Sequence, residues 1–149
     1  MKRILSFIIC VMLLLTATLP TYAAEQTEII YCEETVLENG LVIRDEIIVT
    51  TNARATDKTA TRRQTFKQGD TVIAIIAFQA TFRYTGSTVS VVSKSVTQTD
   101  TYEGYSYKQV SFASSGGTVT LDGKLTKLLL IQQSFTMSLT CDKNGNLST

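Results

Sequence analysis

The chain has 149 residues with 14 basic and 13 acidic side chains, and it contains no histidine. The absence of histidine excludes a Ser-His-Asp triad, a Cys-His dyad and the imidazole-bearing zinc sites of common hydrolases. The nearly balanced charge carries no signature of binding to nucleic acid or to an anionic membrane. The length suits a single domain.

Residues 1–23 have the pattern of a cleavable secretory signal peptide. Lys2 and Arg3 form a positively charged start, and an apolar run follows as far as Leu15. Small side chains at positions −3 and −1 predict cleavage after Ala23, with the next residue as the second choice. An uncleaved anchor is disfavoured, because a membrane span takes about 20 apolar residues and polar residues shorten this run.

The predicted mature protein, residues 24–149, is secreted and has no stable membrane span. Without Lys2 and Arg3, twelve basic residues face thirteen acidic ones, a net charge of −1. The segment is rich in Thr, Ser and Val, which is typical of β-structure. Two cysteines remain, Cys32 and Cys141, and in an extracellular setting they predict one disulfide between the first strand and the last.

Residues 28–50 are predicted to form an N-terminal hairpin. The dipeptide Asn39-Gly40 lies between two apolar segments and is typical of a type I′ turn. Seven acids between Glu25 and Glu46 are followed by five bases between Arg54 and Lys67. We expect these segments to pair as neighbouring strands with opposite charges, and the alternative is a functional acidic or basic face.

The centre of the chain predicts a main sheet. Residues 58–66 are interpreted as a polar edge strand, and residues 71–84 form the clearest strand, because their apolar side chains alternate with polar ones. Ile73 and Ile75 break this alternation, which predicts that the first half of the strand is covered on both faces. The expected core face comprises Val72, Ala74, Ile76, Phe78, Ala80, Phe82 and Tyr84.

The second half of the chain predicts further strands at roughly ten-residue spacing. Residues 88–99 form a strand with a bulge where the valines change phase, and residues 107–113 form the next. A short strand at Val119 and Leu121 is expected to end in an Asp122-Gly123 turn. A long last strand then runs from Leu125, with a core face of Leu129, Ile131, Phe135, Met137, Leu139 and Cys141. This arrangement predicts an all-β fold, an antiparallel β-sandwich, with an open β-barrel as the alternative.

Three segments resemble a family of small, uncharacterised exported proteins of Gram-positive, clostridia-like bacteria. These segments are residues 34–40 (ETVLENG), 80–87 (ATFRYTGS) and 138–148 (SLTCDKNGNLS). The family looks like a domain of unknown function. The resemblance therefore implies export and a β-fold, and it supplies no catalytic residues.

The sequence predicts no enzyme, no metal and no cofactor. A glycosidase needs two cooperating carboxyl groups, and the candidate pairs are Asp100 with Glu103 and Asp45 with Glu46. The first pair lies at a turn, and the members of the second are neighbours on a strand and point to opposite faces. Residues 142–146 resemble half of a calcium loop, but the pattern ends before its twelfth-position ligand, so we expect a plain turn.

The candidate ligand-binding site is the segment with Tyr102, Tyr105 and Tyr107 around Gly104. Exposed tyrosines suit a carbohydrate- or protein-binding surface, and the alternative is that they pack at the end of a strand. The sequence thus predicts a non-enzymatic extracellular or cell-surface binding module, whose partner is an envelope polymer, a glycan or a protein. The alternative is a small secreted effector, a bacteriocin-like toxin or an inhibitor, active whole or as a fragment released near Arg62-Arg63.

Overall fold

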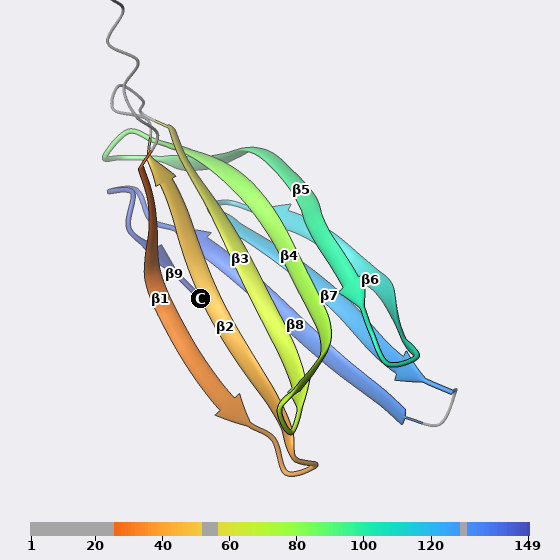
Figure 1. Ribbon diagram of the computed structural model, residues 1–149. Coiled ribbons are helices and arrows are strands. Elements are labelled where there is room, and N and C mark those ends of the chain that lie inside the picture. The colour runs from red at the N-terminus through yellow and green to blue at the C-terminus, as the bar shows by residue number, and fades with distance from the viewer. Residues whose placement is uncertain (1–25, 52–56, 129–130) are drawn as a thin grey trace, which may run out of the picture.

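The computed structural model describes residues 26–51, 57–128 and 131–149 (Figure 1). The predicted signal peptide and its cleavage site at Ala23 lie outside these ranges. Within them, every regular element is a strand, and no helix is long and apolar enough to cross a membrane.

Two antiparallel sheets pack face to face, which confirms the predicted β-sandwich. The first sheet has the order β1-β2-β3-β4-β5 and the second β6-β7-β8-β9. The two sheets do not close into a barrel, because the described strands β5 and β6 follow each other in the chain but belong to different sheets (Figure 1). The strands are β1 (Gln26–Val36), β2 (Leu41–Thr51), β3 (Asp57–Gln68), β4 (Thr71–Tyr84), β5 (Val89–Thr101), β6 (Tyr105–Ser115), β7 (Thr118–Lys127), β8 (Ile131–Cys141) and β9 (Leu147–Ser148).

The core lies between the sheets, where the inward side chains of β4 face those of β7 and β8. Strand β4 has the predicted bounds, and its alternate apolar residues from Ala74 to Phe82 are buried. Each large side chain so buried contributes about 1.5 to 3 kcal/mol. Their main partners across the core are Val119, Leu121, Leu125, Phe135, Met137 and Leu139.

A β-bulge in β4 explains the break in alternation at Ile73. Phe66 of β3 pairs with Ala74 and the next residue pairs with Val72, so Ile73 is the extra residue. The bulge leaves Ile73 only 2% exposed. The prediction of a cover on both faces was therefore wrong for Ile73, whereas Ile75 stays on the outer face.

Strand β3 is a central strand, not the predicted edge strand, because it pairs with both β2 and β4. Its inward positions include Arg62 and Gln64, which are buried although polar. Asp45 of β2 accepts hydrogen bonds from Arg62 Nε at 3.0 Å and from Gln64 Nε2 at 2.9 Å, whereas Gln64 Oε1 has no partner among the described residues. The predicted pairing of the acidic and basic segments is confirmed by this contact.

Two predicted turns differ in the structure. Strand β7 runs through Asp122-Gly123, because Gly123 is a packing position whose added Cβ would lie 2.4 Å from Phe135 Cζ. At Asn39-Gly40 only Gly40 has a positive φ, 76°, so the turn is not type I′. Type I′ geometry occurs instead at Glu103-Gly104, with φ values of 55° and 75°.

Candidate functional site

The outer face of the five-stranded sheet carries a row of aligned residues from four strands. The register places Glu46 of β2 beside Arg63 of β3, and Arg63 beside Ala77 of β4. Gln98 of β5 follows in the same row. Because Ala77 has the shortest side chain of the four, a hollow forms above it between Arg63 and Gln98.

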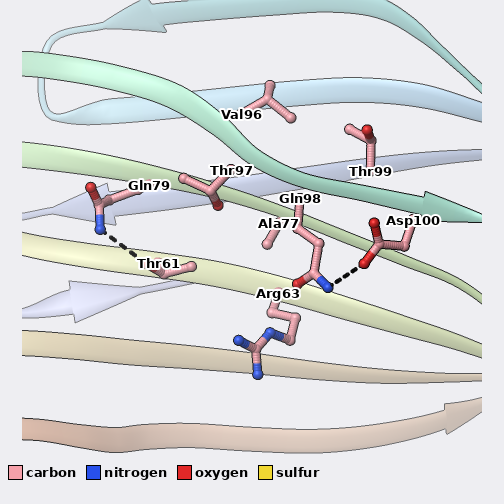
Figure 2. A pocket seen from close by; sticks show the side chains of 9 residues that line it. All are labelled: Thr61, Arg63, Ala77, Gln79, Val96, Thr97, Gln98, Thr99 and Asp100. Atoms are coloured by element: carbon pink, nitrogen blue, oxygen red, sulfur yellow. Dashed lines mark hydrogen bonds between the residues drawn. The ribbon is translucent and has the colours of Figure 1, made fainter.

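This hollow has a volume of about 660 Å³ and is lined mainly by polar groups (Figure 2). Gln79 Nε2 donates to Thr61 Oγ1 at 3.5 Å, and Gln98 Nε2 donates to Asp100 Oδ2 at 2.6 Å. Hydroxyl, amide and carboxylate groups therefore face one space, and the side chain of Arg63 borders it on the side of β2. The lining residues are Thr61, Arg63, Ala77, Gln79, Val96, Thr97, Gln98, Thr99 and Asp100.

Bulges in β5 shape one wall of the hollow. Ala77 pairs with Gln98 and Phe78 with Val96, which leaves Thr97 as an extra residue, and a second bulge falls at Val92. The second bulge confirms the predicted phase change of the valines. The bulge at Thr97 allows five consecutive residues, 96–100, to line the hollow, which a regular strand with alternating faces does not permit.

Two further hollows continue from the first along β4. One of about 400 Å³ shares Arg63 and Gln98 with it, and the other, of about 330 Å³, shares Ile75 with the second and reaches Tyr102. We call the three together the outer groove. It follows β4 from Gln79 to Val72, about 23 Å at the rise of a β-strand. Its remaining residues are Arg44, Glu46, Thr65, Lys67 and Glu103.

Charge in the outer groove centres on Glu46, whose side chain is 8% exposed. Arg44 donates to Glu46 Oε1 from two nitrogens, at 3.0 and 2.8 Å, and this hydrogen bonding raises the pKa of Arg44 above its ordinary value. Arg63 lies farther off, with 4.0 Å between its nitrogen and Glu46 Oε2. The Nε of Arg63 is buried and has no hydrogen-bond partner among the described residues.

The three predicted tyrosines occupy different environments. Tyr102 is 45% exposed and closes one end of the outer groove. Tyr107 stacks on Phe135 with ring centroids 6.2 Å apart, and burial raises the pKa of its hydroxyl. Tyr105 is half-buried, with Lys127 Nζ 5.0 Å from its ring centroid. The structure thus brings only Tyr102 to the groove, while Tyr105 and Tyr107 pack against the core.

The predicted disulfide between Cys32 and Cys141 is not formed, and both thiols are free. Cys32 is exposed on β1 and pairs in register with Glu46, on the side of the outer groove. Cys141 lies on β8 of the second sheet and is only 1% exposed, because its side chain is in the core between the two sheets. The first and last long strands belong to different sheets, so the positions of the cysteines near the chain ends did not bring their sulfurs together.

The carboxylates considered from the sequence form no metal centre in the described ranges. Asp45 and Glu46 point to opposite faces of β2, as expected, because Asp45 binds Arg62 and Glu46 binds Arg44. Asp142 accepts hydrogen bonds at 2.8 Å from the backbone nitrogens of Asn144 and Asn146, which makes a turn.

Sequence reasoning missed Arg63, Gln79 and Gln98 as site residues. One signal was present: the outward positions of β3, from Thr61 to Lys67, are all polar or charged. In the sequence alone, that pattern is equally typical of an edge strand. The groove itself depends on the alignment of separate strands, which no local pattern contains.

Comparison of the chain with protein-family models, curated proteins and solved structures finds no match. The resemblance to exported proteins of Gram-positive bacteria stays a prediction.

Proposed function

We propose that the protein is a secreted, non-enzymatic module that binds a hydroxyl-rich polymer, a polysaccharide of a cell envelope or surface, along the outer groove. The observation that carries this proposal is the form of the groove: it is long, open and lined by hydroxyl, amide and guanidinium groups. Such groups can both donate and accept hydrogen bonds with sugar hydroxyls. Secretion rests on the pattern of residues 1–23.

The shape of the groove favours a polymer over a small ligand. Small-molecule sites are usually enclosed and mostly apolar, with a few polar groups. The outer groove extends along a strand, and its polar groups recur along both of its sides. At one end Tyr102 lies beside Val72 and Ile75, where an aromatic ring can cover the apolar face of a sugar.

The arrangement of carboxylates supports a binding role without catalysis. Glycoside hydrolysis needs one carboxyl group as a proton donor and a second as base or nucleophile. In the groove, Glu46 is largely buried beneath Arg44 and accepts two hydrogen bonds from it. Asp100 accepts a hydrogen bond from Gln98. Glu46 and Asp100 are therefore both occupied by neighbouring side chains, and the third carboxylate of the groove, Glu103, lies at the end near Tyr102.

The alternative of a secreted effector gains no specific support. Release of a fragment near Arg62-Arg63 requires cleavage in β3, a central strand paired on both sides. A protease would have to unfold the sheet first, because the backbone of a paired central strand is inaccessible.

Co-sedimentation of the protein from culture medium with insoluble cell-wall sacculi and with intact cells tests the proposal. The wild-type protein is compared with a groove variant, Gln79→Ala/Gln98→Ala. The matched control is Gln109→Ala/Gln132→Ala, which removes two exposed amides from the second sheet. We expect the wild type and the control to pellet and the groove variant to remain in the supernatant.

Two results would contradict the proposal. If the wild type stays in the supernatant with every sacculus preparation and cell type, envelope binding is wrong. If the groove variant pellets as well as the control, the protein binds through another surface. The loss of Tyr102 alone, in Tyr102→Ala, should weaken pelleting, whereas Tyr107→Phe should not.

A further inference from the structure

Arg63 occupies the centre of the outer groove and is incompletely paired. It lines two of the three hollows, and its guanidinium points toward β2 (Figure 2). Its buried Nε has no partner among the described residues. Its one acidic contact among the described residues is Glu46, whose Oε2 lies 4.0 Å from the guanidinium nitrogen, at the outer limit of an ion pair. A guanidinium has five N–H donors, so donors of Arg63 are left for a ligand.

Cations outnumber acids around this point. Arg44, Arg63 and Lys67 line the middle hollow, and Glu46 is the only acid among its lining residues. Glu46 is already engaged by Arg44 through one of its oxygens. Asp100, which lines the first hollow, pairs in register with Ile75 of the middle hollow, and its carboxylate accepts a hydrogen bond from Gln98. The middle hollow therefore has an excess of positive charge in a chain that is otherwise almost neutral.

We infer that the polymer bound in the outer groove is anionic, and that Arg63 binds its carboxylate or phosphodiester oxygens in the middle hollow. This inference rests on the proposed function. The planar guanidinium presents parallel N–H donors that match two oxygens of a carboxylate or a phosphate. Ala77, which pairs with Arg63 in register, leaves room on the β4 side of the Arg63 side chain for the rest of the sugar or polyol unit.

The strength of the contact should depend on salt. Because the net charge of the chain is small, attraction to a polyanion has to come from this local cluster and not from the field of the whole protein. Local cations at the surface are screened over about 10 Å at 0.1 M ionic strength. Binding should therefore weaken as salt is added, whereas binding to a neutral polymer should not.

Titration calorimetry with defined polymers tests this inference. The probes are polygalacturonate, its fully methyl-esterified and therefore uncharged form, and poly(glycerol phosphate). We expect the purified wild-type protein to bind at least one charged polymer and to bind the methyl ester far more weakly. The two charged probes distinguish a carboxylate from a phosphodiester.

Variants of Arg63 assign the contact. Arg63→Gln should lower the affinity for the charged polymer about 10- to 100-fold, the effect of losing a hydrogen bond to a charged group. Arg63→Lys should restore part of it. The control Lys108→Gln removes the same charge from the second sheet and should bind as the wild type does. Circular dichroism checks that each variant is folded.

The outcomes separate this inference from the function on which it rests. If the wild type and Arg63→Gln bind both forms of the polymer equally well, the groove binds polysaccharide and the anionic inference is wrong. If Arg63→Gln and Lys108→Gln lose equal affinity, Arg63 is not the contact. If none of these polymers and no sacculus preparation binds, the proposed function itself is wrong.

Discussion

Arg62 of β3 donates a hydrogen bond from its guanidinium to the backbone carbonyl oxygen of Ser138 on β8. The contact joins the two sheets at the edge of β8 that faces away from β7. Along that edge β9 pairs only with Thr140 and Cys141. The same guanidinium binds Asp45, so one buried arginine holds β2, β3 and β8 together.

Replacing Arg62 by methionine should destabilise the protein strongly. Asp45, with a side chain 14% exposed, would lose its cationic partner, and breaking a buried pair in this way costs about 3 to 5 kcal/mol. Urea denaturation of Arg62→Met measures the loss. As a control, Arg83→Met breaks the exposed pair with Asp57 and should cost at most about 1 kcal/mol. Equal losses in the two variants would contradict the role assigned to Arg62.

The Gly123→Ala variant tests whether β7 needs glycine for packing. The new methyl group would lie 2.4 Å from Phe135 Cζ and 2.8 Å from Tyr107 Cε2, so one ring must move. We expect a loss of about 1 to 3 kcal/mol in the free energy of unfolding. In the double variant with Phe135→Leu the two effects should not add, because the smaller side chain makes room. Additive losses would show that the rings do not restrict this position.

Local alternation predicted β4 correctly because its inward residues, from Ala74 to Phe82, are apolar and point to one core. The same reasoning failed for β3, where the inward positions include Arg62 and Gln64. Arg62 donates to Asp45 and to the carbonyl of Ser138, and Gln64 donates to Asp45, so the partners of these buried groups come from other strands. Burial of polar residues depends on the tertiary structure, which a period-two pattern does not contain.

The outer groove also depends on the alignment of separate strands, which a local sequence pattern does not contain. Arg63 alone looks like a surface charge, and Ala77 alone looks like a core residue. Their alignment across β3 and β4, together with the bulge that presents Gln98, makes the hollow. Tyr102 could be predicted as exposed from its position in a turn, but its place at the end of the groove follows from the register of the strands.

The free cysteines predict a distinct pattern of thiol reactivity. Cys32 is exposed and should react with a thiol reagent in the folded exported protein. Cys141 should react only after unfolding, because it is buried and burial raises the pKa of its thiol. Adding a reductant should leave the urea midpoint unchanged, whereas a bridge closing so long a loop would contribute about 4 to 5 kcal/mol. Loss of stability on reduction would contradict the structure.

Tyr107→Phe should stabilise the protein by roughly 1 kcal/mol, because it removes a buried hydroxyl that has no partner among the described residues. The pKa of Tyr107 is raised in the folded state by burial. The folded state holds this proton more tightly than the unfolded chain, whose tyrosine pKa is about 10. The stability linked to the neutral hydroxyl is therefore fully present below pH 10 and is lost as the pH rises through the pKa of the folded state. Urea denaturation between pH 8 and pH 11 should therefore show a smaller alkaline loss in Tyr107→Phe. An unchanged alkaline loss would contradict this assignment.

Acid should destabilise the second sheet through Asp122. Ser111 Oγ and Thr136 Oγ1 donate to its carboxylate at 2.6 and 2.7 Å and lower its pKa in the folded state. As the pH falls, the aspartate of the unfolded chain takes up a proton first, near pH 4. The stabilisation is therefore present above that pH and is lost as the pH falls through the lower pKa of Asp122 in the folded state. Denaturation measured between pH 6 and pH 2.5 should show a shallower fall in the free energy of unfolding for Asp122→Asn than for the wild type.

Asp142, whose pKa is lowered mainly by Asn146, should behave likewise in Asp142→Asn. If both variants keep the wild-type slope, the hydrogen bonds to these carboxylates do not favour their ionised forms in the folded protein.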